Sequence, residues 1–154
     1  MRVSKKIMTL PNHIMLGLII GKVTGNYTLA TSVSVLVDCD HLISLHKHGA
    51  LRSWKKFWEA ETNPEDPWGD QRGILHTLFS VFVGTSLVAF LFGPMMGGTW
   101  FLAHFGHIFL DYISDSDTWV FKPFSNFKTR GFVPYYSKYE VLFFLGLVVI
   151  FFLI

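Results

Sequence analysis

Residues 13–37 read HIMLGLIIGKVTGNYTLATSVSVLV, an apolar stretch interrupted at its centre by Lys22, Thr24, Gly25 and Asn26. A lysine and a Gly-Asn pair would be costly at the centre of a membrane-spanning helix, whereas they suit a turn. The pattern predicts two short helices, over residues 13–23 and 27–37. Each would be about 17 Å long, too short to cross a hydrocarbon core of about 30 Å. We therefore expect a helical hairpin.

The hairpin would return the chain to the side from which it started. His13 would then lie beside the segment Asp38-Cys39-Asp40-His41, although the two are far apart in the sequence. The alternative is a single spanning helix over residues 13–37, which would leave His13 on the opposite side of the membrane. The position of His13 therefore decides between the two folds.

Composition indicates an integral membrane protein. The chain has 154 residues, of which 51% are hydrophobic and only 16% are charged, and it contains 16 Phe. These values are too apolar for an ordinary soluble domain, and the length is that of one domain, residues 1–154. A net charge of +2 without a basic stripe gives no indication of nucleic-acid binding. The single Cys39 cannot form an internal disulfide.

Two further apolar runs, residues 74–92 and 99–112, flank the Gly- and Pro-rich residues 93–98. They predict an antiparallel transmembrane pair joined by a turn. Residues 141–154 predict a closing apolar helix, which spans a bilayer only if it is tilted or starts at the interface. The fold class we expect is an all-α integral membrane protein built as a small helical bundle.

The polar segments between the apolar runs have their own pattern. Leu51, Trp54, Phe57 and Trp58 fall on one helical face, which fits a helix lying in the membrane interface. Residues 61–67 predict a loop, and residues 114–139 an irregular segment. Twelve of the thirteen Lys and Arg residues lie on one side of this topology, and only Lys22 lies on the other. The positive-inside rule then predicts an inner or plasma membrane protein whose polar side faces the cytoplasm.

His and Asp residues gather on that same side. Positions 104, 107 and 111 share one helical face, and an antiparallel pair would bring His76 to their depth. The groups expected to converge are His13, Asp38, Asp40, His41, His76, His107 and Asp111. Imidazole and carboxylate are ligands for zinc or another divalent first-row metal. More ligands than one ion needs predict two ions that share a carboxylate.

Five motifs between residues 12 and 124 carry a resemblance. They are Asn12-His13, Asp38-Cys39-Asp40-His41, Arg72-Gly73-Ile74-Leu75-His76-Thr77, Gly106-His107-Ile108-Phe109-Leu110-Asp111 and Phe121-Lys122-Pro123-Phe124. Their order and spacing resemble the YdjM-type family of membrane-bound metal-dependent hydrolases. That family is distantly similar to zinc-dependent phospholipase C and related single-strand nucleases, helical enzymes that cleave phosphoesters with several zinc ions.

The resemblance implies roles for individual residues. The implied metal ligands are His13, Asp40, His76, His107 and Asp111, with Asp111 as the bridge and Asp38 as a further ligand or base. The family usually shows His-Arg-Gly before Thr-His-Ser, whereas this chain has Gln71 before Arg72 and Leu75 before His76. The role of Arg72 is therefore open between a catalytic phosphate-binding group and a cation at the membrane interface.

The hypothesis is a metal-dependent hydrolase acting on a phosphorylated lipid or another membrane-proximal phosphoester. One ion would be held by Asp40, His76, His107 and Asp111, and a second by His13, Asp38 and the shared Asp111. His41 and His104 would either orient ligands or simply pack. The alternatives are a non-enzymatic carrier of divalent metal ions and a structural membrane protein. A zinc protease is not indicated, since His-Glu-x-x-His is missing.

Overall fold

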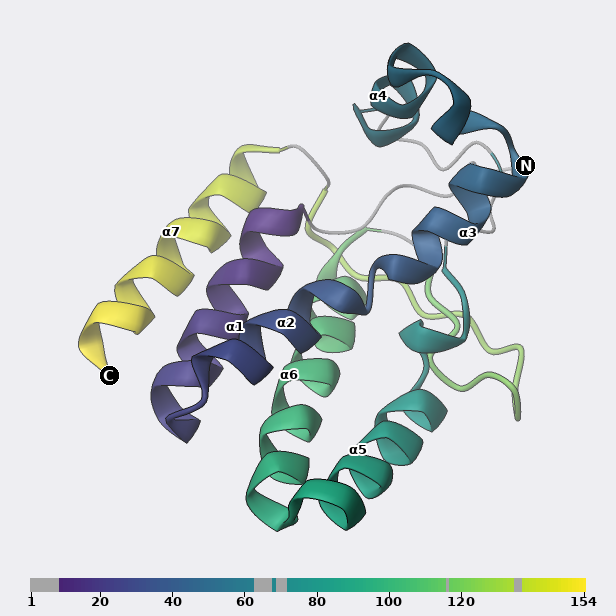
Figure 1. The fold of residues 1–154 in the computed structure, drawn as a ribbon. Coiled ribbons are helices and arrows are strands. Elements are labelled where there is room, and N and C mark those ends of the chain that lie inside the picture. The colour runs from purple at the N-terminus through teal and green to yellow at the C-terminus, as the bar shows by residue number, and fades with distance from the viewer. Residues whose placement is uncertain (1–8, 63–67, 69–71, 116, 135–136) are drawn as a thin grey trace.

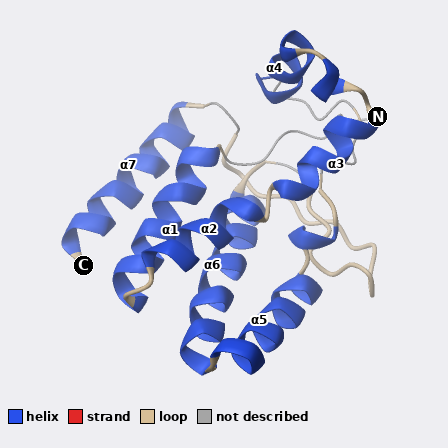
Figure 2. Ribbon diagram, in the orientation of Figure 1, coloured by secondary structure: helices blue, strands red, loops and turns tan. Residues whose placement is uncertain are grey.

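The computed structural model describes residues 9–62, 68, 72–115, 117–134 and 137–154, and it is all-helical in these ranges (Figures 1 and 2). The helices are α1 (Leu10–Thr24), α2 (Tyr27–Leu36), α3 (Cys39–Lys47), η1 (Ala50–Arg52), α4 (Trp54–Thr62), η2 (Ile74–His76), α5 (Leu78–Phe92), α6 (Pro94–Ile113) and α7 (Lys138–Leu153), where η marks a 3-10 helix. Two isolated β-bridges, Ser114 to Val133 and Thr118 to Thr129, hold the segment between α6 and α7. The all-α prediction is confirmed.

The predicted hairpin is present between α1 and α2. Gly25 ends α1 in the left-handed region, with φ of +75°, and the Asn26 side chain accepts a hydrogen bond from the Leu29 N–H at 3.0 Å. These are the C-cap and N-cap roles that glycine and asparagine favour. The two helices approach closely at Gly17, where a Cβ atom would lie 2.6 Å from the Thr31 Cα. The chain therefore doubles back at Gly25, as the sequence predicts.

The second antiparallel pair is α5 and α6, which lie side by side in Figure 1. The turn predicted over residues 93–98 is wrong, because α6 already begins at Pro94 and only Gly93, with φ of +91°, makes the reversal. Proline is favoured in the first turn of a helix. Gly97 serves packing instead, since a Cβ atom there would lie 2.5 Å from the Ala89 Cβ.

Helix α6 is the centre of the bundle. It packs against α5, α2 and α1, while α7 packs on the far side of α1 (Figure 1). Ile20, Ala30, Val33 and Ala103 form the buried core where α1, α2 and α6 meet. Glu140 in α7 accepts hydrogen bonds from the Thr9 N–H and the Asn12 amide, and so fixes the start of α1.

Other boundaries differ from those predicted. His76 does not lie inside the outgoing helix, because the Thr77 side chain caps α5 by accepting from the Ser80 N–H and leaves residues 74–76 as η2. Leu51 belongs to η1 rather than to the Trp-rich helix α4, and α4 runs on through residues 61–62. The remainder of the predicted loop, residues 63–67, lies outside the described residues.

One helix among the described residues is long and apolar enough to cross a membrane by length and composition. It is the run Tyr27–Lys47, in which α3 continues from α2, whereas α5 is apolar but shorter. The transmembrane pair over α5 and α6 therefore stays a prediction. The interior of the run Tyr27–Lys47 carries Asp38 and Asp40, and ionisable groups inside such segments mark functional sites.

We predict that Gly17→Ala destabilises the protein by about 1–3 kcal/mol, because the new methyl group would overlap the α2 backbone and overpack the helix contact. The matched control is Gly98→Ala in α6, where a Cβ atom meets open space and alanine gains up to about 1 kcal/mol of helix propensity. Thermal unfolding of both variants in detergent measures the difference. Equal melting temperatures would contradict the close α1–α2 contact.

Candidate metal centre

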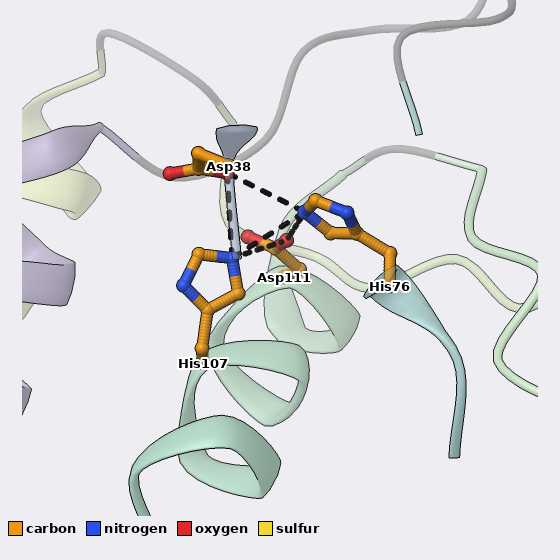
Figure 3. Close-up of side chains that lie close together, drawn as sticks. All are labelled: Asp38, His76, His107 and Asp111. Carbon is orange, nitrogen blue, oxygen red and sulfur yellow. Dashed lines mark hydrogen bonds and ion pairs between the residues drawn. The ribbon is translucent and has the colours of Figure 1, made fainter. Parts of the chain in front are cut away.

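Four ligand-type side chains meet where three separate parts of the chain come together (Figure 3). Asp38 lies between α2 and α3, His76 lies in η2, and His107 and Asp111 lie one turn apart on α6. His76, His107 and Asp111 are buried, whereas the Asp38 side chain is 24% exposed. The cluster is thus an enclosed site that opens at Asp38.

Five of the six separations among the four facing atoms are nearly uniform, and all four atoms lie within 4.8 Å of one another. His76 Nε2 lies 3.4 Å from Asp38 Oδ1 and 3.2 Å from Asp111 Oδ2. His107 Nε2 lies 3.4 Å from the same two oxygens and 3.4 Å from His76 Nε2. A regular tetrahedron with such edges has its centre about 2.1 Å from each corner, which is the bond length of zinc to nitrogen or oxygen ligands. The cluster therefore has the dimensions of a tetrahedral zinc site.

The hydrogen bonds behind the two histidines fix which nitrogen faces the cluster. His107 Nδ1 lies 2.6 Å from the Ser34 carbonyl oxygen, and His76 Nδ1 lies 3.0 Å from Asp40 Oδ2. Both oxygens can only accept, so each Nδ1 must carry a proton and each Nε2 presents a lone pair in the neutral ring. Partners of this kind are typical behind metal-bound histidines.

The buried oxygen atoms of the cluster would be stabilised by a cation. Asp38 Oδ1 and both Asp111 oxygens are buried and accept no hydrogen bond. With both rings neutral, four acceptors thus face one another without a donor, and buried carboxylates in that state are costly unless a positive charge joins them. The residues present therefore fit a divalent metal ion.

The pKa of His76 also indicates that the cluster favours a positive charge. Burial alone would lower the pKa of His76, but its contacts with Asp111, Asp38 and Asp40 raise the pKa well above its ordinary value. The carboxylates thus favour a proton on this ring when no other cation is present. A metal ion must displace that proton to bind.

Asp40 contacts Nδ1 of His76, the ring nitrogen that faces away from the cluster, and is not one of the four cluster residues. Besides the contact with His76 Nδ1, its Oδ2 accepts the Gly73 N–H at 2.8 Å, and a Cβ atom at Gly73 would lie 2.9 Å from that oxygen. The structure therefore differs from the expected division of ligands, since Asp38 takes the place expected for Asp40. His41 Nε2 lies 3.7 Å from Asp38 Oδ1, and Asp40, His41 and His76 form a second group that could hold an ion.

His13 joins the cluster on its other side. Its Nε2 lies 3.4 Å from Asp111 Oδ1, and its ring stacks on that of His107 with 3.8 Å between centroids. Both ring nitrogens of His13 are buried without a hydrogen-bond partner. Asp111 thus directs Oδ2 to His76 and His107 and Oδ1 to His13.

Two predicted residues contact the site indirectly. His104 Nε2 lies 2.8 Å from the Leu75 carbonyl oxygen and so anchors η2 to α6. Arg72 Nη1 donates to Thr118 Oγ1 at 2.9 Å and to the Asp117 carbonyl oxygen, which ties the start of η2 to the segment after α6. Sequence reasoning missed the Ser34 carbonyl, because a backbone acceptor has no residue-type signal.

A comparison with protein families supports the family resemblance inferred from the five motifs. The family model described as YdjM inner membrane protein matches residues 8–154. The chain belongs to the YdjM inner membrane protein family. This confirms the YdjM family predicted from the five motifs and makes the chain a member of a membrane protein family. Neither the comparison with curated proteins nor that with solved structures gave a match.

We predict that Asp111→Ala and His76→Ala each abolish stoichiometric metal binding, because each removes a corner of the tetrahedron. The measurement is elemental analysis of protein purified in detergent and dialysed against zinc. His46→Ala is the control, since His46 is exposed at the end of α3 and should leave the metal content unchanged. Undiminished metal in both cluster variants would refute the site.

A separate prediction concerns Asp40→Asn. Because Asp40 orients His76 from behind, the variant should still bind one ion per chain but about 10–100-fold more weakly. Competition with a zinc-sensitive dye measures the affinity. Complete loss of binding would instead make Asp40 a direct ligand, as the sequence motif implies.

Proposed function

We propose that this chain is a membrane-bound metal-dependent hydrolase that cleaves a phosphoester of a lipid or of another membrane-proximal substrate. The observation that supports the proposal is the buried cluster of four acceptor atoms with zinc-like separations, in a chain of an inner membrane protein family. The choice of a phosphoester rests on the resemblance to zinc-dependent phospholipases and on the chemistry of paired ions, which clamp both oxygens of a displacement.

Asp38, His76, His107 and Asp111 would hold the first ion, and His13 with the second oxygen of Asp111 would contribute to a second. When bound, ions of this type lower the pKa of a coordinated water and polarise the phosphoryl oxygen. The protein holds His76 and His107 in one tautomer through Asp40 and the Ser34 carbonyl, so both rings are preorganised as ligands.

Asp38 is the group of the cluster best placed to meet substrate. It is the least buried member, with its side chain 24% exposed, and its Oδ1 faces both His76 and His107. A carboxylate in that position can orient a water molecule and accept its proton. Arg72 remains a candidate phosphate-binding residue, although its Nη1 is engaged with Thr118.

The membrane arrangement is part of the proposal. The cluster lies at the end of the bundle where α1 and α7 begin and α6 ends (Figure 1). Twelve of the thirteen Lys and Arg residues belong to segments on that side of the topology, and cations are enriched on the cytoplasmic side of inner membrane proteins. We therefore assign the cluster to the cytoplasmic face, with α5 and α6 as the membrane pair.

The test is hydrolysis of phospholipid and phosphomonoester lipids in mixed micelles. We predict that chelation abolishes turnover, that zinc restores it, and that Asp38→Asn lowers kcat by about 100-fold or more because a charged metal ligand and proton acceptor is lost. His46→Ala should keep full activity. Folded, metal-loaded protein that hydrolyses none of these substrates contradicts the proposal.

A metal carrier is the alternative to an enzyme. Transport requires ligands along a path across the membrane, whereas the described ligands gather at one end of the bundle. Zinc flux into proteoliposomes decides between them: protein-dependent flux that Asp111→Ala abolishes would replace the hydrolase by a carrier.

A further inference from the structure

The turn that contains Phe121-Lys122-Pro123-Phe124 has no part in the metal centre, yet it forms a defined groove. The groove lies between this turn and the first two turns of α5, and its cavity volume is about 540 Å³. Its lining is Leu78, Phe79, Phe82, Val120, Phe121, Lys122, Phe124, Ser125 and Phe127. That volume falls within the range of small-ligand sites, and the lining is apolar except for one lysine and one serine.

The position of the turn against α5 is fixed by specific contacts. The Leu78 N–H donates to the Val120 carbonyl oxygen at 2.8 Å, and Val120 packs into a buried cluster with Val81 and Ile108. The Phe79 and Phe124 rings meet edge to face with 5.8 Å between centroids. Specific contacts between the turn and α5 therefore define the shape of the groove.

Large apolar side chains are left uncovered along the groove. Phe82 is 63% exposed, Phe124 is 81% exposed and Phe127 is 63% exposed. Exposed apolar patches rimmed by polar groups mark contacts with a membrane or a partner. For a member of an inner membrane protein family, such a patch fits hydrocarbon.

Positive charge stands at one rim of this surface. Lys122 and Lys128 each place an ammonium group over the Trp119 ring, at 4.8 Å and 4.7 Å from the ring centroid. Lys128 also pairs with Asp117, whereas no carboxylate among the described residues pairs with Lys122. Tryptophan and lysine together are typical of the headgroup level of a bilayer. The rim therefore offers one unpaired cation to an anionic headgroup.

We propose that this groove binds one anionic phospholipid, with an acyl chain along Phe79, Phe82 and Phe124 and the phosphate beside Lys122. The charge complementarity at Lys122 selects this occupant over a neutral lipid. The lipid is a bound ligand and not the substrate, so the site is independent of the proposed hydrolysis. A bound lipid would hold the turn of residues 121–124 against α5. This turn follows Thr118, which Arg72 joins to η2.

Native mass spectrometry of the full chain, titrated in detergent with dioleoyl phosphatidylglycerol or dioleoyl phosphatidylcholine, tests the proposal. We expect one phosphatidylglycerol to bind about fivefold more tightly than phosphatidylcholine, the difference that one lysine makes at an anionic surface. Lys122→Gln should remove this preference and leave phosphatidylcholine binding unchanged. Lys55→Gln in α4 is the charge control and should behave as the wild type.

A second pair of variants tests the apolar part. Phe82→Asp should abolish binding of both lipids, whereas Phe90→Asp, on the same helix and 86% exposed, should not. Equal loss in the two variants would show general coating of α5 by lipid and overturn the site. Equal affinity of the wild type for the two lipids would overturn the headgroup assignment. Because Lys122 lies in an exposed turn, its variant remains informative if Phe82→Asp fails to fold.

Discussion

Four acceptor atoms that face one another without a donor are the constraint on which the structure depends. Asp38, His76, His107 and Asp111 come from three parts of the chain, and their repulsion makes the folded state costly unless a cation joins them. The same constraint explains where the elements end. Asp38 separates α2 from α3, and His76 stands in η2 just before the Thr77 cap of α5. The helices thus end next to Asp38 and His76, two residues of the cluster.

The surrounding structure determines which atoms face inward. Ser34 and Asp40 accept from the Nδ1 atoms of the two histidines, so each Nε2 is directed into the cluster. Gly73 lets the backbone approach Asp40, since a Cβ atom there would lie 2.9 Å from Oδ2 and would displace the carboxylate. Helix α1 adds His13 from the far side, and Gly17 allows α1 and α2 to touch there. Small residues therefore serve both the helix packing and the placement of the cluster.

The sequence predicted the hairpin well, because turn-forming residues in the middle of an apolar run have few alternatives. It also predicted the residue types that meet in the cluster. It did not predict that Asp38 rather than Asp40 faces the cluster, because that depends on the helical phase at the break between α2 and α3. The glycines of residues 93–98 were misread as a turn, since glycine serves both reversals and close helix packing.

Lys22 departs from the predicted one-sided distribution of Lys and Arg, and a local contact explains its position. Lys22 lies in the last turn of α1, and its Nζ donates to the Phe151 carbonyl oxygen at 2.8 Å while lying over the Phe151 ring. The carbonyls in the last turn of a helix have no partner within it and carry partial negative charge, so an ammonium group there is stabilising. Lys22 is thus held by the end of α7 whichever side of a membrane it faces. Its position therefore gives no information on the orientation in a membrane, and the proposed orientation depends on the side predicted for the other twelve Lys and Arg residues.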